Sequence, residues 1–426
     1  MRALVLGGAG TMGRWVVRDL TESDGVDEVA VADLDAGRAL EAAGWAAARA
    51  GATGTASVRG LELDAADGAA LRHAFAHVDV VCNCAGHATN LRVMEACADA
   101  GTHYVDLGGL FHTTREQLTL HDRFVAAGVT AVVGMGASPG TSNVMAALAA
   151  GELGRVDSLD VRVGIADPAP SRASLPVPYS IDTLLDQLSE PAVTYCDGAF
   201  LEVPAMSGQE VLDFPDPVGR TRVGHSLHSV LATLPVSFAP RGVRQVSFKL
   251  GFGSDFMERM DLLIGLGLAS NRPLELDGGW VVPRDLLIRC IRAAGKQRCA
   301  EQPADGAVAI WVRARGRRAG QPEGTALAPT SPEPAAPVPM EVLAECVARS
   351  HPRWRTGAGQ LVTGVPASVV AQFLAHGVVD RPGVLSPEQA VPPGPYFAEL
   401  ARRSVEVTLI TRTPVAACTG SERNQA

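Results

Sequence analysis

The sequence predicts an α/β protein built around a doubly wound parallel sheet, with a second domain of the α+β type. Three observations predict this fold class. The first 150 residues alternate short β-branched runs with helix-like stretches, as βαβ units do. A Gly-x-Gly-x-x-Gly pattern lies between the first predicted strand and the first predicted helix. From about Asp157 the strand-like segments follow one another more directly, as expected for an antiparallel meander with added helices.

The elements of the first part follow from the spacing of apolar residues. Strands are expected at Arg2–Leu6, Glu28–Ala32, Val58–Leu63, Val78–Cys84, Tyr104–Leu107 and Val129–Val133. Helices are expected at Thr11–Ser23, Leu34–Ala50, Leu91–Ala100 and Thr114–Ala127. This alternation favours right-handed crossovers and a parallel sheet covered on both faces.

The second part is predicted in the same way. Its strands are expected at Val161–Ile165, Ala199–Val203, Val211–Phe214, Gly219–Val223 and Gln245–Leu250. Its helices are expected at Ile181–Leu188, Met257–Leu268, Pro283–Ala294, Met340–Arg349 and Ala367–His376. The segment Ala319–Pro339 is rich in Pro, Ala and Gly and is interpreted as a loop or linker.

Composition excludes several classes of function. The chain has 426 residues, of which 47% are hydrophobic and 19% charged, enough for a sizeable core. The net charge of −9 argues against nucleic-acid or anionic-membrane binding. The eight cysteines show neither zinc-site spacing nor a disulfide framework, so we expect no metal site. With no signal pattern at the amino terminus, the protein is predicted to be cytoplasmic.

The glycine pattern indicates a dinucleotide site. Gly8, Gly10 and Gly13 permit a tight turn, close approach of the backbone to a pyrophosphate and close helix–strand packing. Thr11 and Met12 then present backbone N–H groups to the anion at the helix start. Asp33 follows Gly13 by 20 residues, at the end of the second strand, where an acidic side chain binds the adenosine ribose. Because a carboxylate repels a 2′-phosphate, NAD is predicted rather than NADP.

Two further polar residues lie at the carboxyl ends of predicted strands, where such sheets bind ligands. Asp64 is a candidate for the adenine side of the cofactor and Asn83 for the nicotinamide side. Their structural alternatives are a helix N-cap for Asp64 and a buried, hydrogen-bonded amide for Asn83.

A family resemblance runs through most of the chain. It is carried by Tyr104–Gly109, Glu116–Leu118 with Leu120-His121, Ala137–Gly140, Ser180 with Leu184–Asp186, Pro191-Ala192, Glu202–Pro204, His225-Ser226, Ser237-Phe238, Phe248-Lys249, Pro283–Asp285, Ala371-Gln372, Gly377-Val378, Gly383-Val384 and Pro387–Gln389. These residues resemble the saccharopine dehydrogenase superfamily, and within it the L-lysine 6-dehydrogenases. The sequence departs from the family at His228, in the long loop 319–339 and in the tail 411–426.

The resemblance implies a discontinuous architecture. Residues 1–140 form the Rossmann domain, residues 355–410 complete it, and residues 141–354 form an inserted domain for substrate binding and oligomerisation. It further implies a homodimer or a higher homo-oligomer, and a small amino-acid substrate.

Oxidation of an amine requires its neutral form, and a lysine side chain has an unperturbed pKa of about 10.4. The site must therefore desolvate the amine or supply a base. Asp106 and the histidines are the candidates, and the family match favours His225 over His228. The alternative for either histidine is a packing role.

Lys249 and Arg284 are candidates for holding a substrate carboxylate. Their alternative is a surface salt bridge. Tyr179 and Asp182, at the start of a predicted helix, are weaker candidates, and Asp182 also suits the helix N-terminus.

The sequence thus predicts NAD-dependent oxidative deamination of the terminal amine of L-lysine or a related diamino acid, giving a semialdehyde that cyclises to a cyclic imine. The nearest rival is a saccharopine-type dehydrogenase or reductase acting on a secondary amine. A rival from another class is a catalytically inactive dinucleotide-binding regulator.

Overall fold

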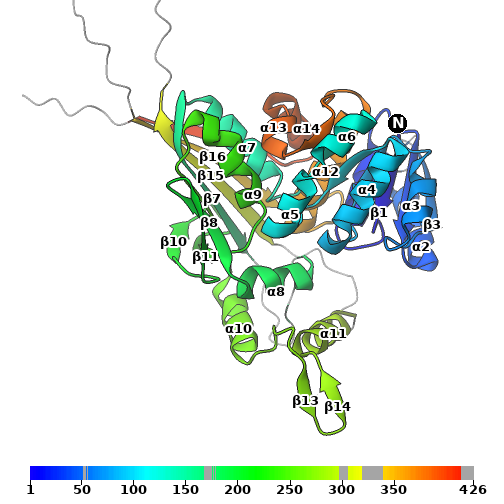
Figure 1. Ribbon diagram of the computed structural model, residues 1–426, viewed down its shortest axis with the longest axis horizontal. Coiled ribbons are helices and arrows are strands. Elements are labelled where there is room, and N and C mark those ends of the chain that lie inside the picture. The colour runs from blue at the N-terminus through cyan, green and yellow to red at the C-terminus, as the bar shows by residue number, and fades with distance from the viewer. Residues whose placement is uncertain are drawn as a thin grey trace, which may run out of the picture.

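The computed structural model contains two sheets, each with its own helices (Figure 1). It describes residues 1–50, 54, 56–166, 175, 177, 179–296, 306–318 and 339–413, and the side chains of residues 294–296 are not among them. Most of the loop 319–339 and of the tail 411–426 therefore lies outside the described residues.

The first sheet has seven strands in the order β17-β6-β5-β4-β1-β2-β3, and all of its strand pairs are parallel. The strands are β1 (Arg2–Leu6), β2 (Glu28–Asp33), β3 (Ser57–Glu62), β4 (Val80–Asn83), β5 (His103–Asp106), β6 (Thr130–Val132) and β17 (Gly383–Leu385). The central strands are buried on both faces, because a parallel sheet carries its crossover helices on both sides. The predicted fold class is confirmed.

Helices cover this sheet on two sides. One face packs against α1 (Gly13–Glu22), α2 (Ala36–Ala50) and α12 (Ala358–Ala375). The other packs against α3 (Gly68–Phe75), α4 (Asn90–Ala100) and α6 (His121–Ala127). The helix expected at Thr114–Ala127 is two helices, since α5 (Leu110–Leu118) ends before α6 begins. Gly128, in a left-handed conformation, closes α6.

The second sheet has nine strands, seven of them in the order β10-β11-β12-β7-β15-β16-β18, with β8 and β9 branching from β12. They are β7 (Arg155–Ala166), β8 (Ala192–Cys196), β9 (Ala199–Val203), β10 (Glu210–Asp213), β11 (Arg220–His225), β12 (Gln245–Phe252), β15 (Ala307–Arg317), β16 (Pro339–Arg349) and β18 (Val407–Arg412). The expected meander holds for β10, β11 and β12, but β12 pairs parallel with β7, so the sheet is mixed.

The helix predicted at Met340–Arg349 is wrong. These residues form β16, which pairs with β15 over its whole length. Alternate residues from Met340 to Ala348 are buried, which is the period of a strand. The helix was predicted because the segment contains Ala, Leu and Glu, which have high helix propensity. The long antiparallel pairing with β15 outweighs that propensity.

The chain returns to the first sheet after leaving the second. β17 adds to the edge of the first sheet, next to β6, and is followed by α13 (Pro387–Ala390) and α14 (Pro393–Arg402). Residues 407–410, expected in the first domain, instead belong to β18 of the second sheet. There they pair the open edge of β16, whose backbone groups would otherwise lack partners.

Helix α12 links the two parts, because it contacts β4 and β5 of the first sheet and β15 and β16 of the second. It is long and apolar enough to cross a membrane by length and composition alone, but 72% of that window is buried inside the protein. It is therefore a core helix.

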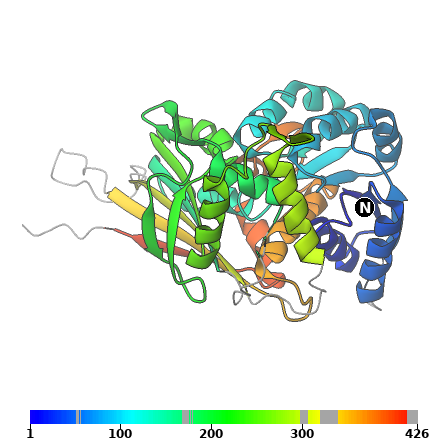
Figure 2. The ribbon, with the colours of Figure 1, turned by 90° about the horizontal axis from the view of Figure 1, so that it is seen from below.

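The remaining helices are α7 (Thr141–Gly151), α8 (Ile181–Ser189), α9 (Val230–Phe238), α10 (Ser254–Gly265) and α11 (Pro283–Lys296). In Figure 1, α10 and α11 lie below most of the protein, so Figure 2, seen from below, shows them in front of the other elements. The short hairpin of β13 (Leu274–Leu276) and β14 (Gly279–Val281) projects away from the body (Figure 1).

Candidate active site

A cavity of about 1000 Å³ lies between the two sheets. On one side it is lined by the loops that follow β1, β4, β5 and β6, at the carboxyl ends of the parallel strands. On the other side it is lined by β7, β12, α8 and α11. A ligand bound in the glycine-rich turn would therefore meet a second ligand held by the other domain.

The glycine-rich turn leaves no room for side chains. A Cβ atom on Gly13 would lie 2.3 Å from the carbonyl oxygen of Gly7, and one on Gly8 would lie 2.8 Å from Val31. The left-handed residue of the turn is Gly7, with φ of +72°, rather than Gly8. Gly10 closes the turn by donating its N–H to the Gly7 carbonyl oxygen at 2.9 Å.

The start of α1 offers free donors. Within the described part of the chain, the backbone N–H groups of Thr11, Met12 and Gly13 have no acceptor, and Thr11 and Met12 line the cavity. Unpaired N–H groups at a helix N-terminus bind anions such as a pyrophosphate. The turn therefore fits the phosphates of a dinucleotide.

Asp33 ends β2 and is almost buried, with 9% of its surface exposed. Its carboxylate lies 3.7 Å from the guanidinium of Arg38, which also donates to the Ala9 carbonyl oxygen at 3.1 Å. The expected ribose ligand is thus accompanied by a cation that the sequence analysis did not select. A carboxylate favours a free 2′-hydroxyl, whereas an arginine favours a 2′-phosphate.

Asn83 and Asp64 have different surroundings. Asn83 lines the cavity at the end of β4, where its amide nitrogen donates to Asn90 and its oxygen accepts from the Ala85 N–H. Asp64 is exposed, accepts from the N–H of Ala66 and does not line the cavity. The helix N-cap considered for Asp64 is supplied by Asp67 at α3.

Asp106 lies beneath the floor of the cavity and is not part of its lining. Its carboxylate accepts hydrogen bonds from the hydroxyl of Tyr104, the amide of Gln117 and the backbone N–H groups of Gly108 and Gly134. Burial raises the pKa of this carboxyl above its ordinary value in spite of these donors. Asp106 therefore positions the two loops that line the cavity, and the structure does not support it as the base.

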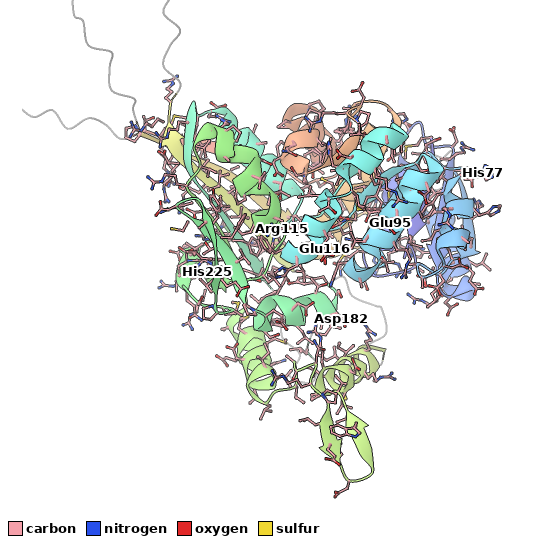
Figure 3. All side chains as sticks on the ribbon, in the orientation of Figure 1. His77, Glu95, Arg115, Glu116, Asp182 and His225 are labelled. Atoms are coloured by element: carbon pink, nitrogen blue, oxygen red, sulfur yellow. The ribbon has the colours of Figure 1, made fainter. Side chains whose placement is uncertain are left out.

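The two candidate histidines lie opposite to expectation, since the sequence favoured His225 as the site residue. His228 lines the cavity, whereas His225 lies on the far face of the second sheet (Figure 3). His225 pairs with Lys249, and Lys249 is flanked by Phe248 and Leu250, which do line the cavity. Because neighbouring residues of a strand point to opposite faces, both His225 and Lys249 point away from the cavity.

Lys249 forms an ion pair with Glu210 at 3.1 Å on that far face. Its expected role in holding a substrate carboxylate is therefore corrected. His225 was favoured by its family match, but burial, together with Lys249 and Arg162, lowers the pKa of its ring. Neither residue reaches the cavity.

His228 is held as a neutral ring. Its Nδ1 accepts the N–H of Val230 at 3.3 Å, so Nε2 carries the proton and donates it to the carbonyl oxygen of Ser138 at 3.0 Å. The ring stacks on Phe248 with centroids 3.7 Å apart. Burial lowers the pKa of His228 to about 3. Since both nitrogens are engaged, His228 is a wall of the cavity and not a base.

This burial predicts acid sensitivity. The unfolded chain binds a proton at His228 below about pH 6.5 and the folded protein does not until about pH 3, so the free energy of unfolding falls as the pH is lowered between these values. From pH 7 to pH 5 we expect a loss of about 2 kcal/mol from this residue. Urea unfolding of the wild type and of His228→Gln at both pH values measures it. Equal losses in the two proteins would contradict the prediction. Asp106 is present in both proteins, so its contribution to the pH dependence cancels in the comparison.

Arg284 is buried and also outside the cavity lining. It pairs with Asp186 at 2.6 Å and donates to the backbone carbonyl oxygen of Asp182. These bonds fix α11 onto α8. The structure thus gives Arg284 a positioning role in place of the expected contact with substrate.

Other lining residues supply what these candidates do not. Tyr179 lines the cavity as expected, with its hydroxyl donating to Gln187 at 2.5 Å. Arg292 lines the cavity two turns after Arg284 on α11. His87 lines it from the loop after β4, and no hydrogen bond of its ring is recorded within the described residues. Neither Arg292 nor His87 is predicted from the sequence, which carries no local signal for either residue.

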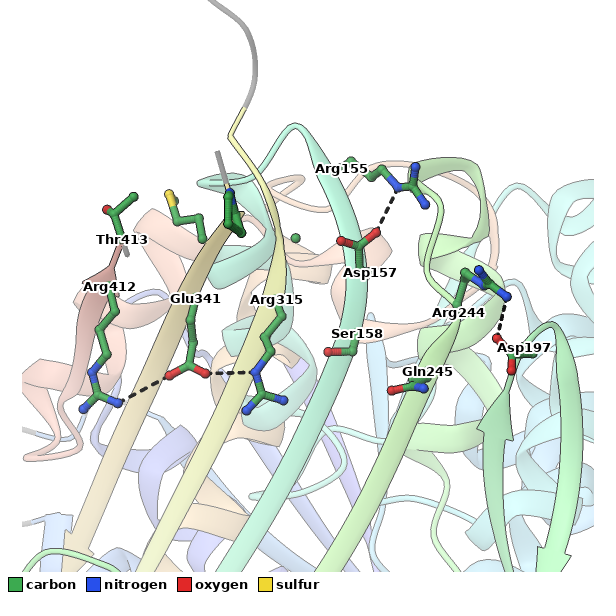
Figure 4. Close-up of a pocket in the computed structure, with 13 residues that line it drawn as sticks. Arg155, Asp157, Ser158, Asp197, Arg244, Gln245, Arg315, Glu341, Arg412 and Thr413 are labelled. Carbon is green, nitrogen blue, oxygen red and sulfur yellow. Dashed lines mark hydrogen bonds and ion pairs between the residues drawn. The ribbon is translucent and has the colours of Figure 1, made fainter. Parts of the chain in front are cut away.

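A second hollow of about 790 Å³ lies at one end of the second sheet (Figure 4). Each of its arginines contacts an acidic residue: Arg155 pairs with Asp157 at 2.9 Å and Arg244 with Asp197 at 2.7 Å, while Arg315 and Arg412 share Glu341 at 2.9 and 3.3 Å. Because these charges are paired with one another, we do not assign the active site to this hollow but to the cavity between the two sheets.

Comparison with protein-family models supplies the deciding observation. Residues 3–132 match the saccharopine dehydrogenase NADP binding domain, and residues 136–405 match the saccharopine dehydrogenase C-terminal domain. The chain belongs to the saccharopine dehydrogenase family. Its first part accordingly corresponds to the dinucleotide-binding domain of that family, and the broader resemblance seen in the sequence is confirmed.

Relatives within the saccharopine dehydrogenase family are distant. Carboxynorspermidine synthase of Vibrio cholerae is 29% identical over 218 residues, and that of Vibrio alginolyticus is 26% identical over 218 residues. Each match covers 48% of this chain and 50% of the relative, so the chain spans about half the length of the curated relatives it matches.

The fold of the family is shared over nearly the whole chain. Apo histidine-tagged saccharopine dehydrogenase (L-Glu forming) from Saccharomyces cerevisiae superposes with a TM-score of 0.68 at 17% identity, covering 96% of this chain and 99% of that one. The narrower likeness to lysine 6-dehydrogenases stays a prediction.

Proposed function

We propose that this member of the family oxidises the terminal amine of L-lysine, or of a related diamino acid, with NAD as the electron acceptor. The observation that carries the proposal is the cavity itself. It joins the glycine-rich turn to a chamber whose second-domain wall is mostly apolar, including Val163, Ile165, Phe248 and Leu250. Such a wall suits the methylene chain of lysine and disfavours a charged amine at its far end.

The reaction balances with one hydride and one water. A hydride leaves the carbon bearing the terminal amine, the amine loses a proton, and a carbon–nitrogen double bond forms. Water then adds to that imine and ammonia leaves, giving the semialdehyde. The α-amine attacks the aldehyde carbon and a water leaves, which closes the cyclic imine. NAD supplies the hydride-accepting chemistry when bound, and the chain binds, orients and shields the substrate.

His87 is the group we assign to accept the amine proton. Of the two histidines in the described lining, His228 has both ring nitrogens engaged, whereas His87 does not. His87 follows β4 at the carboxyl edge of the first sheet, on the side of the cavity that includes Asn83 and Ser138. Amine oxidation should rise with pH as the amine loses its proton.

NAD is proposed over NADP because the Asp33 carboxylate ends β2. Replacing Asp33 with Asn should free Arg38 to bind a 2′-phosphate, shifting the ratio of kcat/KM for NADP over NAD by about tenfold toward NADP. Arg38→Leu in the same background should reverse that shift. A wild-type protein that uses NADP at least as well as NAD would contradict the assignment.

A second candidate is the formation or cleavage of a secondary amine. The curated relatives are named for synthesis of a carboxylated polyamine, and their sequence identity to this chain supports that chemistry. The described lining holds a single permanently charged side chain, that of Arg292, which argues against a substrate with several carboxylates such as saccharopine.

One assay separates these readings. Lysine and NAD, without a 2-oxo acid, should give NADH, ammonia and a trappable cyclic imine. Deuterium on the carbon bearing the terminal amine should appear in NADH, and deuterium on the α-carbon should not. Turnover only with an added carbonyl compound and a reduced dinucleotide would favour the secondary-amine reaction. No turnover with any amine, despite dinucleotide binding, would favour a regulator.

We also propose a homo-oligomer, as the family resemblance implies. Large apolar side chains are exposed on α10, at its C-terminal cap and on the projecting hairpin, including Leu262, Leu266, Leu274 and Trp280. Exposed apolar patches of this kind support a protein partner. Light scattering that gives the mass of a single chain would contradict this proposal.

A further inference from the structure

The charge in the cavity is concentrated at one point. Among the described lining residues Arg292 is the only arginine or lysine, and no aspartate or glutamate lines the cavity. Arg292 pairs with Asp182 at 3.0 Å. The two side chains are 64% and 45% exposed, so the pair is open to solvent and can exchange partners.

The position of the pair connects it to the cavity. Asp182 lies on α8 between Ile181 and Thr183, and both of these neighbours line the cavity. Arg292 follows Ile291 on α11, which also lines it. The pair thus lies where two lining helices meet, and Figure 3 shows Asp182 at the end of α8 that faces the first domain.

Arg284 holds together the two helices that carry the pair. The buried Arg284 side chain bonds both to Asp186 and to the backbone carbonyl oxygen of Asp182. The distance between α8 and α11 is therefore fixed independently of the exposed pair. Opening the Arg292–Asp182 contact would leave a cation and a carboxylate facing each other across a small gap.

The geometry points to a site for the head group of an α-amino acid at this pair. The substrate carboxylate binds Arg292, the α-ammonium binds Asp182, and the side chain extends along the apolar wall toward the carboxyl edge of the first sheet. A guanidinium and a carboxylate complement the two charges of a zwitterion at low desolvation cost, because both side chains are already partly solvated. This inference rests on the proposed amine oxidation and adds the residues that hold the head group of the substrate.

Three amines of matched length test it. L-Lysine carries both charges of the head group, 6-aminohexanoate lacks the α-amine and 1,5-diaminopentane lacks the carboxylate. Arg292→Met should lower kcat/KM for lysine and 6-aminohexanoate by about 10- to 30-fold and leave 1,5-diaminopentane within about threefold. Asp182→Asn should lower kcat/KM for lysine and 1,5-diaminopentane and leave 6-aminohexanoate within the same limit.

Each test variant has a matched control, on the same helix as Arg292 or at the same helix position as Asp182. Arg289→Met removes an exposed arginine from α11, one turn before Arg292 and outside the lining. Asp285→Asn removes an acid from the first turn of α11, as Asp182→Asn does from α8. Both controls should leave all three amines unchanged. If Asp182 merely stabilises the helix N-terminus, its variant will lower the melting temperature and affect all three substrates alike.

Binding gives a readout separate from turnover. Calorimetric titration of the three amines into the protein with NADH should show the same crossed pattern of losses. Binding with this pattern but no oxidation would overturn the proposed function and keep the head-group site. Oxidation of lysine with no crossed pattern would overturn the head-group site and keep the function. Neither binding nor oxidation of lysine would overturn both.

Discussion

Replacing His87 with glutamine is expected to lower kcat for amine oxidation by about 100- to 10,000-fold, the range that loss of a general base covers. Glutamine keeps the approximate size and polarity of the ring but cannot take a proton from the amine. The binding of the dinucleotide should be unchanged, since the free N–H groups that fit its phosphates lie in the turn at Gly8–Gly13. Steady-state kinetics with lysine and fluorescence titration with NADH measure the two effects separately.

Two further results would distinguish a base from a structural residue at this position. Added imidazole should restore part of the rate of His87→Gln, and His77→Gln should oxidise lysine at the wild-type rate. His77→Gln is the matched control, because His77 is exposed and lies on the far side of the first domain (Figure 3). A decrease in kcat of less than about fivefold for His87→Gln would contradict the assignment of His87 as the base. It would mean that desolvation alone makes the amine lose its proton.

Replacing Gly13 with valine is expected to raise the Kd for NADH by about 100-fold or more, since overpacking a tight contact costs several kcal/mol. The first side-chain atom would already lie 2.3 Å from the Gly7 carbonyl oxygen and 2.9 Å from Gly8. The turn must open to relieve this contact, and opening it moves the free N–H groups of Thr11 and Met12. Fluorescence titration of the reduced dinucleotide checks the result.

The control for this change is Gly44→Val on α2, where a Cβ atom would meet nothing within 4 Å. It should bind NADH normally. Circular dichroism and the melting temperature should show that Gly13→Val keeps its second sheet, so that lost binding is not lost folding. Binding within threefold of the wild type would mean that the phosphates do not contact this turn.

The first sheet could be predicted because its signals are local. Buried parallel strands such as β1 and β4 are short apolar runs, and Gly10 and Gly13 are required by contacts with Gly7 and Gly8, only a few residues away. The same reasoning identified Asp33 at the end of β2. At Met340–Arg349 the helix propensity of the residues competed with the period of a strand, and it led to the wrong prediction of a helix. Only the pairing with β15 shows that this segment is a strand.

The candidate site was harder to predict, because a residue's face on a sheet decides its role. Lys249 and Phe248 are adjacent in sequence, yet Phe248 lines the cavity and Lys249 pairs with Glu210 on the other side. His225 and His228 differ only in that β11 ends between them, so the first follows the strand and the second turns into the cavity. A one-residue change of register inverts such assignments.

By itself the sequence determined the fold class, the dinucleotide turn and the family, since these depend on short patterns and on similarity along the chain. The tertiary structure alone decided which side chains share the cavity. Arg292 and Asp182 are 110 residues apart, and only the packing of α11 against α8 brings their charges to 3.0 Å. Contacts between distant elements arise from burial of whole helix and sheet faces, a property that no single segment carries.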